Sequence, residues 1–586
     1  MQIDVAEALN LLCVDDLKAL ARQLPVPPLA NRKAELVTAI SCALLGPGLN
    51  ALWERLDALS RSAVAEAAHE YRGEFLAQQF PAKYQRSPAF KESNKPAALG
   101  LFIYRHFAER SLGIPTDLRQ RLLEFVPKPA SAQIQTVAEP EPVPGLVQRQ
   151  TELDAAQELA LVLRMLETER VTLGGKTGVA STASQRLLLA KLPAGDFYPW
   201  VEPANKWEQH IGPIKAFAWP LLLQAGGLAK CVGTRLTLTS AGIKAMSVAP
   251  AQTLRLLWNK WLGNHLLDEF SRVEAIKGQK SAGRVMSAAD DRRDAIEQAL
   301  QDCPVSQWVA LPEFSRFMQA SGRDFVVTHD PWKLFIAERQ YGSLGYEGSH
   351  TWGLLQHRYI LALLFEYAAT LGLIDVAYTD PTELEGGLED FRDLWGADEL
   401  TFLSRYDGLR FFRINALGAF VLGLSDTYQS PRPASAVGLR VLPSLSIGVS
   451  SGALDEQARQ MFDTWAVQLP DDLWRLDRSK ALVALEKGYD IQALQAFLQD
   501  HTTQDLPESV AAFVAECRAN ALAVKASGVA TLLTCCDAAT AARIAAHPKL
   551  SALCWCVEPK TLVVRTDRLA KFRAVLSQEL GLGLVA

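Results

Sequence analysis

One proline-rich stretch divides the chain before any motif is considered. Residues 127–145 have the sequence PKPASAQIQTVAEPEPVPG, in which proline, alanine and small polar residues follow no apolar period. Proline removes a backbone donor and fixes φ, so neither a helix interior nor a central strand can run through such a segment. This composition favours an extended or flexible linker. We therefore expect a linker over 127–150, with separate domains on each side.

Length, charge and hydropathy bound the class of protein. The 586 residues are enough for three to five domains, and 49% hydrophobic with 21% charged residues is typical of a globular protein. The net charge of −5 argues against a protein that grips nucleic acid by bulk electrostatics. No secretory leader follows Met1, and the apolar run 359–374 is too short to cross a bilayer. Nine cysteines without an export signal favour a cytoplasmic protein with no membrane partner.

The first 46 residues predict two short helices joined by a proline-bearing turn, with Asp15 and Asn31 as N-caps. The run 12–37 is similar to a SAP motif, a small helical DNA-binding unit, although Asn31-Arg32-Lys33 stands where that motif often has Gly-x-Lys. The resemblance implies phosphate contacts near a helix N-terminus. The alternative is an ordinary helical hairpin with solvated charges. The candidate DNA-contacting residues are Lys18, Arg22, Arg32 and Lys33.

Residues 47–126 are predicted to form an all-helical domain. Between residues 72 and 110, seven basic residues stand against three acids, and Tyr84, Phe90 and Tyr104 are interleaved with them. Basic and aromatic residues together can hold phosphates and stack on bases, but a solvated helical face is the more common explanation of such a pattern. The candidate DNA-contacting residues here are Lys83, Arg86, Lys91 and Lys95.

The segment 151–250 predicts a winged-helix-like domain. Three helices are expected first, at 153–167, 182–192 and 213–225. A hairpin then pairs 230–232 with 236–238 across Gly233-Thr234, and Thr239-Ser240 caps a closing helix. Its basic residues make this unit the better candidate for DNA contact, because a winged helix usually places its third helix in the major groove. They are Lys206, Lys215, Lys230 and Arg235, of which Lys230 and Arg235 are the candidate contacts.

The segment 251–430 predicts a second winged-helix-like domain with an acidic insertion over 381–400. Its expected helices are 290–300, 311–322 and 359–372, and its strands are 373–378 and 409–418, with a tight turn at Asp407-Gly408. Glu366 is the only charge in the third helix after Arg358, so this unit is better suited to packing or docking a protein. The loop 273–284 adds candidate phosphate contacts at Lys277, Lys280 and Arg284.

No catalytic or cofactor motif survives inspection. Gly175-Lys176-Thr177 lacks the earlier glycine of a phosphate-binding loop, because Arg170 occupies that position. Cys535, Cys536, Cys554 and Cys556 lack the usual spacing of a zinc site, and Cys554 and Cys556 are expected to be buried in a strand. We expect no cofactor, no metal and no enzymatic activity. A nuclease assembled from distant residues is kept as a third alternative.

The last third, 431–586, has a distinctive order of elements. A strand-like run, GLRVLPSLSIGV (438–449), is followed by a helical region over 474–519. A strand, helix, strand, strand and helix are then expected over 532–580, with Pro559-Lys560 turning between the last two strands. This series resembles the XPB-like N-terminal, or helicase-associated, domain, although Pro443-Ser444 stands where that family has Pro-Asp. The resemblance implies an accessory role beside a DNA helicase motor.

The sequence therefore predicts a mainly α chain with α+β parts. Its expected domains are a SAP-like helical motif (1–46), a helical domain (47–126), a linker (127–150), two winged-helix-like domains (151–250 and 251–430) and an α+β helicase-associated domain (431–586). We expect a DNA-binding adaptor that serves a helicase or other ATPase supplied as a separate chain, in DNA repair or in defence against phage DNA. The alternative is a protein-interaction scaffold whose winged helices touch no nucleic acid. Dispersal of the basic candidates would favour the scaffold.

Overall fold

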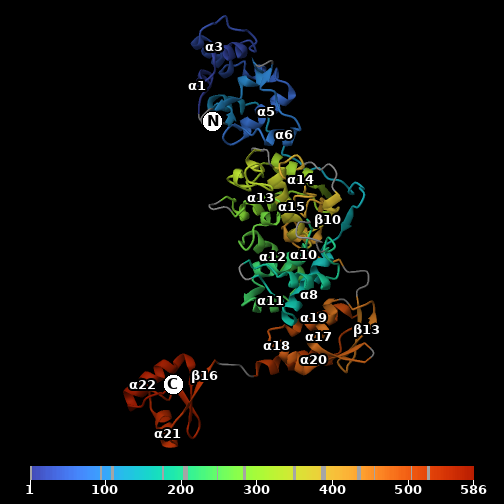
Figure 1. Cartoon of the computed structure of the whole chain (residues 1–586), viewed down its shortest axis with the longest axis vertical. Helices are drawn as coiled ribbons and strands as arrows, with labels where there is room; N and C mark the ends of the chain where they lie inside the picture. The colour runs from blue at the N-terminus through green and yellow to red at the C-terminus, as the bar shows by residue number, and fades with distance from the viewer. Residues whose placement is uncertain are drawn as a thin grey trace.

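The chain is a mixed α+β protein whose computed structural model consists of three units stacked along one axis and a fourth set apart from them (Figure 1). The units are an N-terminal unit up to residue 126, a middle body to about 430, a third unit over 437–523 and a C-terminal unit over 528–585. The residues described by the structure are 3–92, 95–106, 111–174, 177–201, 209–246, 248–280, 285–346, 352–383, 391–431, 437–454, 456–470, 472–502, 504–523 and 528–585.

The N-terminal unit is not all-helical. Its helices are α1 (Val5–Asn10), α2 (Val14–Ala21), α3 (Lys33–Leu45), α4 (Leu49–Glu54), α5 (Ala58–His69), α6 (Gln79–Tyr84) and α7 (Thr116–Leu122). Its strands are β1 (Glu74–Phe75), β2 (Lys91–Glu92), β3 (Lys95–Pro96), β4 (Tyr104–His106) and β5 (Ser111–Gly113). The strands form a small sheet of order β1-β5-β4 and a separate β2-β3 pair. The all-helical prediction for 47–126 is therefore wrong.

The first turns of the chain also differ from the prediction, because three helices replace the expected two. Asp4 and Glu7 form a capping box that starts α1. The N-cap of α2 is Cys13 rather than Asp15, which lies inside the first turn. Arg32 rather than Asn31 precedes α3, and its side chain makes no capping hydrogen bond. Short polar residues were good cap candidates, but the helices begin where their apolar faces meet the core.

The linker is extended, as predicted, but it is held against the middle body. Val137 forms a two-way backbone bridge with Trp308, and the backbone N–H of Gln135 donates to Glu313 Oε1 at 2.7 Å. Arg316 donates to Gln133 O at 2.8 Å and also to Ala82 O of the N-terminal unit at 2.8 Å. Gln79 Nε2 adds a 3.0 Å bond to Ala320 O. The flexible interpretation is therefore wrong for residues 133–137, which help to join two units.

The elements of the first half of the middle body include all those predicted, plus a strand at 147–149, inside the expected linker, and a helix at 250–262. They are β6 (Val147–Arg149), α8 (Glu152–Thr168), α9 (Thr182–Lys191), α10 (Lys215–Ala225), β7 (Ala229–Val232), β8 (Arg235–Leu238), α11 (Ser240–Ala245) and α12 (Pro250–Leu262). Val232 pairs with Arg235, which confirms the turn at Gly233-Thr234, and the Thr239 side chain caps α11. A single-residue bridge from Thr172 to Arg235 adds a third short strand beside the hairpin.

The second half repeats the order helix, strand, helix, helix and two strands. It contains α13 (Ala289–Gln301), β9 (Trp308–Ala310), α14 (Leu311–Ala320), α15 (Arg358–Ala362), β10 (Ile374–Tyr378), β11 (Leu409–Ile414) and α16 (Ala416–Val421). π-helical turns, Gly353–His357 and Leu363–Ala368, flank α15. Tyr378 pairs with Leu409, so the whole segment 379–408 lies between the two strands. The tight turn predicted at Asp407-Gly408 therefore does not join them.

The sheet of the second half recruits a strand from the other end of the middle body. Its order is β6-β10-β11-β9, with Val376 opposite Arg149 and Phe412 opposite Val309. The strand β6 precedes α8 in sequence. The rest of the first half therefore lies, along the chain, between β6 and the other three strands of this sheet. A single hydrophobic core runs from Ala155 to Leu422, across the boundary expected near residue 250. The two predicted domains thus form one packed body.

The third unit packs a sheet of order β12-β13-β15-β14 against helices and docks on α8. Its elements are β12 (Gly438–Val441), β13 (Ser446–Ser451), α17 (Glu456–Trp465), β14 (Ala466–Leu469), β15 (Leu473–Leu476), α18 (Arg478–Glu486), α19 (Ile491–His501) and α20 (Glu508–Leu522). The strand-like run 438–449 is a hairpin rather than one strand, with Pro443-Ser444 in its turn. Lys487 Nζ lies 2.8 Å from Glu167 Oε1 of α8 and joins the unit to the middle body.

The C-terminal unit is a separate α+β fold, visible apart from the rest in Figure 1. Its elements are β16 (Ala530–Thr534), α21 (Ala538–Ala546), β17 (Cys554–Glu558), β18 (Thr561–Arg565) and α22 (Leu569–Leu580), in sheet order β16-β18-β17. This confirms the predicted order of elements over 532–580. The segment 431–586 therefore contains two hydrophobic cores, and among the described residues no hydrogen bond or ion pair joins the last unit to the others.

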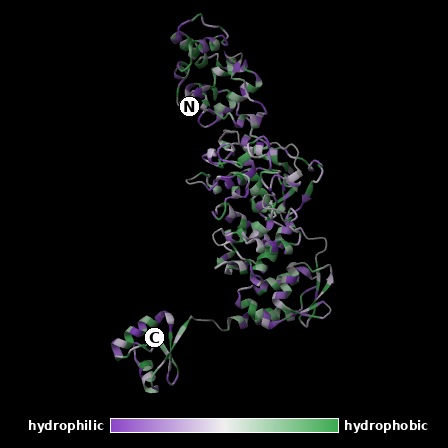
Figure 2. Ribbon diagram, viewed as in Figure 1, coloured by the Kyte–Doolittle hydropathy of each residue, from purple (hydrophilic) through white to green (hydrophobic). Residues whose placement is uncertain are grey.

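Hydrophobic residues are spread over all four units rather than gathered in one long segment (Figure 2). Among the residues that the structure describes, no helix is both long enough and apolar enough to span a membrane.

Candidate functional site

The basic candidates of the SAP-like region have unequal freedom. Arg22 and Arg32 are exposed, and Lys18 is half-buried. Lys33 Nζ donates to Asn10 O at 2.8 Å, so its ammonium group satisfies a carbonyl at the C-terminal end of α1. A cation at that position also complements the helix dipole. Arg22 and Arg32 thus remain available for an external ligand, while Lys33 already has a structural partner.

The second group of candidates loses its aromatic partners. Lys83 Nζ lies 2.5 Å from Glu66 Oε1 with its side chain only 15% exposed, and the Tyr84 hydroxyl donates to the same oxygen at 2.7 Å. Tyr104 is buried, with its hydroxyl bonded to Leu101 O, and Phe90 packs edge-on against Phe75. Tyr104 is in the core and the other two rings pack against it, which argues against the alternative in which these aromatic residues stack on bases. Three basic residues of this group remain exposed: Arg86, Lys91 and Lys95.

The third helix of the first half, α10, is buried from Lys215 to Leu223. Lys215 is 1% exposed, and its Nζ lies 2.6 Å from Glu158 Oε1. The other oxygen of the same carboxylate, Oε2, accepts a hydrogen bond from Trp219 Nε1 at 3.0 Å. Lys215 therefore cannot contact DNA. Arg235 is half-buried and donates to Glu169 O at 3.1 Å, whereas Lys230 on β7 is exposed. The predicted helix contact with DNA is wrong for this half.

The third helix of the second half is buried as well. Every residue from Arg358 to Ala369 has an exposed fraction of 5% or less. The helix lies against α10, and Arg272 connects the two. The Arg272 guanidinium stacks on the Phe217 ring of α10, with 3.5 Å from Cζ to the ring centroid, and its Nε lies 3.1 Å from Glu366 Oε2. The helices that would enter DNA grooves are thus both buried in the core of the middle body.

The basic loop before α13 is placed elsewhere on the middle body. Lys277 and Lys280 are exposed, and Arg284 lies outside the described residues, as do Lys206 and the Gly175-Lys176 pair. No hydrogen bond or ion pair among the described residues links this loop to the basic side chains of the N-terminal unit or to Lys230. The candidates are therefore distributed over separate units rather than gathered by direct contacts.

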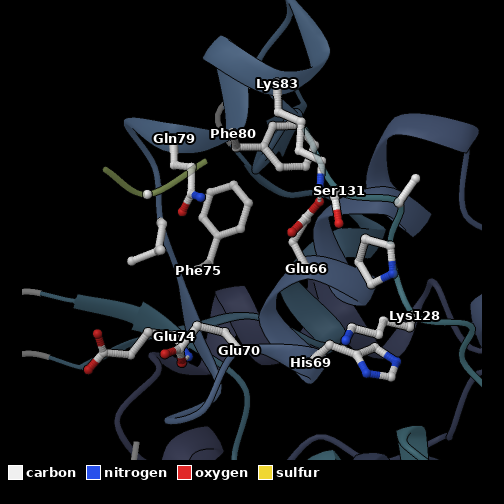
Figure 3. Close-up of a pocket in the computed structure, with 14 residues that line it drawn as sticks. Glu66, His69, Glu70, Glu74, Phe75, Gln79, Phe80, Lys83, Lys128 and Ser131 are labelled. Atoms are coloured by element: carbon white, nitrogen blue, oxygen red, sulfur yellow. Dashed lines mark hydrogen bonds and ion pairs between the residues drawn. The ribbon is translucent and has the colours of Figure 1, made fainter. Parts of the chain in front are cut away.

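A cavity of about 340 Å³ lies where the N-terminal unit, the linker and α14 meet (Figure 3). Phe75 and Phe80, with ring centroids 5.2 Å apart, give it an apolar wall. The polar residues that line it include Glu66, His69, Glu70, Lys83 and Lys128. Sequence reasoning missed this cavity, because its residues come from two units and a linker and share no motif.

The polar groups of the cavity are mostly engaged with the protein itself. Glu66 holds Lys83 and Tyr84, and burial and the nearby carboxylate raise the pKa of the Tyr84 hydroxyl. Glu70 Oε2 accepts from the backbone N–H groups of Arg72 and Glu74 at 2.6 and 2.9 Å. His69 Nε2 lies 3.0 Å from Val126 O. This arrangement stabilises the junction between the N-terminal unit and the middle body.

The cysteines of the C-terminal unit do not behave as one group. Cys554 is buried, but Cys556 is exposed because β17 is an edge strand, so the expected burial of both is wrong. Among the described residues, no cluster of three or more His, Cys, Asp and Glu side chains has the arrangement to hold a metal ion.

Comparison of the chain with models of known protein families gives no match, and comparison with curated proteins gives none either.

Proposed function

We propose that this chain is an adaptor, in which the third helices of two winged-helix-like units form the core of a protein scaffold instead of entering DNA grooves. The burial of α10 and of the third helix of the second half, whose π-helical turn Leu363–Ala368 contacts α10, carries the proposal. A winged helix that recognises DNA needs an exposed third helix with side chains that reach base edges. Here those positions hold core residues such as Trp219 and Phe365, both with no exposed surface.

The C-terminal unit is the proposed docking site for a partner protein. Its helices α21 and α22 cover one face of the sheet, and the other face carries a row of apolar side chains across three strands. Leu532 pairs with Val563, and Val563 pairs with Trp555, while Leu532 and Trp555 are 69% and 52% exposed. An exposed apolar face of this kind marks an interaction surface. The resemblance to helicase-associated domains supports an XPB-type helicase as its partner.

A second candidate function is DNA binding by the N-terminal unit. Its support is that five of the candidate side chains on this unit are exposed and form no hydrogen bond or ion pair with a described residue: Arg22, Arg32, Arg86, Lys91 and Lys95. Their number predicts a weak, salt-sensitive contact, since each phosphate contact adds to the salt dependence. The two functions are compatible, because the docking face and these side chains belong to different units.

One set of full-length variants tests both functions. Leu532→Asp with Trp555→Ala should abolish co-purification with a co-expressed XPB-type helicase, and Trp53→Ala on the N-terminal unit should not. Arg22→Glu with Arg32→Glu should weaken binding to a labelled duplex, and Lys230→Glu should leave it unchanged. Loss of duplex binding in the Lys230→Glu variant would overturn the scaffold proposal, because it would place DNA on the first winged-helix-like unit. Co-purification that survives the Leu532→Asp, Trp555→Ala change would overturn the docking site.

A further inference from the structure

Four large aromatic side chains are exposed together on the middle body, in the segments before α15 and β11. Trp332, Tyr341, Tyr346 and Trp395 have exposed fractions of 54%, 53%, 66% and 62%. We call these four residues the aromatic surface. Large aromatic groups are rarely left in water without a function, because each removes a large apolar area when it is covered. Among the described residues, most of the strongly exposed aromatic side chains belong to this surface.

The aromatic surface is built on a hairpin-like loop. Leu344 N donates to Leu334 O at 2.9 Å and Ile336 N donates to Gly342 O at 3.0 Å, which brings residues 332 and 346 opposite each other. The rings of Trp332 and Tyr346 meet edge to face, with centroids 5.0 Å apart. Tyr341 and Trp395 form a second pair at 5.4 Å. The loop 332–346 therefore supplies three of the four rings, and Trp395 supplies the fourth from a separate segment.

Close contacts position the Trp332 ring and the backbone segment that carries Trp395. A Cβ at Gly345 would lie 2.1 Å from Cδ2 of Trp332, so the indole packs directly on this glycine. Gly396 has φ of +84°, and a Cβ there would lie 2.5 Å from the Ala337 Cβ, which seats the Trp395 segment against the tip of the loop. Rings that are oriented before binding lose little conformational entropy when a ligand covers them.

Cations lie along one side of the same loop. Lys277 exchanges two backbone hydrogen bonds with Phe335, at 2.8 and 3.1 Å, so the basic loop that starts at Lys277 is attached to the hairpin. Lys277, Lys280 and Arg339 are exposed and form no ion pair with any described residue. Lys333, in contrast, forms an ion pair with Asp330, with 3.3 Å between Nζ and Oδ2. The acids Glu338 and Asp393, near the aromatic residues in sequence, are also exposed. Because they repel phosphates, a bound polyanion should lie next to Lys277 and Lys280 instead.

We propose that the aromatic surface binds single-stranded nucleic acid, with bases stacked on Trp332 and Trp395 and phosphates held by Lys277 and Lys280. Proteins that bind single strands without reading sequence combine stacking aromatic side chains with cations that follow the backbone. Duplex DNA is a poorer ligand, because its bases are already stacked on one another. A partner protein could also cover the exposed tryptophans, but an uncharged protein surface would leave Lys277, Lys280 and Arg339 without a binding partner. The inference does not depend on the adaptor proposal.

The test is binding of the full chain to a labelled oligothymidylate of roughly 16 nucleotides, followed by fluorescence anisotropy at low salt. Trp332→Ala with Trp395→Ala should weaken binding by about tenfold or more, because each stacked base contributes strongly to affinity. Trp332→Phe with Trp395→Phe should restore most of it. Tyr71→Ala is the control, since it removes an exposed aromatic side chain from another unit.

Charge variants separate stacking from backbone contact. Lys277→Glu with Lys280→Glu should lower the salt dependence of binding by about one unit for each lysine, and Glu338→Lys should strengthen binding. Oligothymidylate affinity unchanged in the Trp332→Ala, Trp395→Ala variant would overturn the proposal. So would an equal loss of duplex affinity in that variant, or loss of a protein partner in it without any loss of oligothymidylate binding. The variants replace exposed side chains, and an unchanged melting temperature checks that they fold.

Discussion

The middle body and the C-terminal unit are stabilised in different ways. In the middle body, ion pairs sit inside the core: Arg293 and Glu269 have no exposed surface and lie 2.7 Å apart. The C-terminal unit has an apolar core around Phe572, and its ion pairs, such as Lys549 with Glu579, lie at the surface. Another buried pair, Arg272 with Glu366, joins segments 94 residues apart, a separation longer than the whole C-terminal unit.

This difference teaches where the specificity of the fold resides. A buried charge is costly unless its partner is in place, so each pair penalises any arrangement that separates the two helices it connects. Surface pairs carry no such penalty, because water replaces the partner and the net contribution is about 0–1 kcal/mol. The middle body is therefore specified by a few polar contacts, and the C-terminal unit by the burial of a small number of apolar side chains.

Removal of one buried partner should break the middle body most severely. Arg293→Ala leaves Glu269 without its guanidinium partner and frees the carbonyls of Trp261 and Leu267 that Arg293 now satisfies. We expect a loss of about 3–5 kcal/mol in the free energy of unfolding, measured by urea titration with tryptophan fluorescence. The control is Lys549→Ala at the surface, which should cost less than about 1 kcal/mol. Equal effects from the two variants would contradict the comparison.

The C-terminal unit should unfold by itself when its core is damaged. Phe572 has no exposed surface, and Phe572→Ala should cost about 3–4 kcal/mol through lost burial and a cavity. Hydrogen exchange should then show faster exchange over 530–580 and no change in α12 or α15. A common loss of protection in both regions would mean that the two units share one folding transition.

The pH dependence of stability should reveal Glu366. Burial raises its pKa from 4.5 to about 7, although the guanidinium groups of Arg272 and Arg405 act in the opposite direction. An acid with a raised pKa takes up a proton on folding, so its contribution to stability is full below pH 4.5 and falls until the pH reaches about 7. The loss is at most about 3 kcal/mol. Relative to wild type, Glu366→Gln should therefore gain stability between pH 5 and pH 8, measured by urea midpoints. A constant difference across this range would show that Glu366 stays ionised in the fold.

The smallest expected effect concerns the junction of the N-terminal unit with the middle body. Arg316→Ala removes hydrogen bonds to Ala82 O and Gln133 O, which connect two units and the linker. We expect a cost of about 1–2 kcal/mol, seen as faster proteolysis within 127–137 and little change in the melting of the core. Arg121→Ala, whose guanidinium bonds only within the N-terminal unit, is the control. Similar cleavage rates in both variants would show that Arg316 does not hold the N-terminal unit and the linker against the middle body.

Local patterns predicted local structure well. The hairpin at Gly233-Thr234 and the elements over 532–580 follow from alternation, turn residues and short separations, and both are present. The SAP-like pair of helices was less accurate, because cap position depends on packing as well as on the capping side chain. The N-terminal sheet was missed since its strands are two or three residues long and carry almost no periodic signal.

Features that depend on distant contacts were not predictable from these patterns. Lys215 looked like a surface cation near a DNA-binding helix, but Glu158, far away in sequence, draws it into the core. Tyr104 and Phe90 looked like stacking residues and are core residues. The aromatic surface had a usable signal, since Trp332, Tyr341 and Tyr346 lie close in sequence beside a basic loop, but exposure cannot be deduced from spacing alone.

The position of β6 has a consequence for synthesis of the chain. Thr151, two residues after the end of β6, donates its backbone N–H to Asp375, the second residue of β10, 224 residues later. A ribosome that adds ~5–20 residues per second needs roughly 10–40 s to make the intervening chain. Throughout that interval β6 lacks its partner strand β10. The first half of the middle body is therefore synthesised with unpaired backbone N–H and C=O groups along β6, which we call the open seam. A truncated product released before β10 would keep that seam exposed, which gives cellular proteases and chaperones a simple mark of an unfinished molecule.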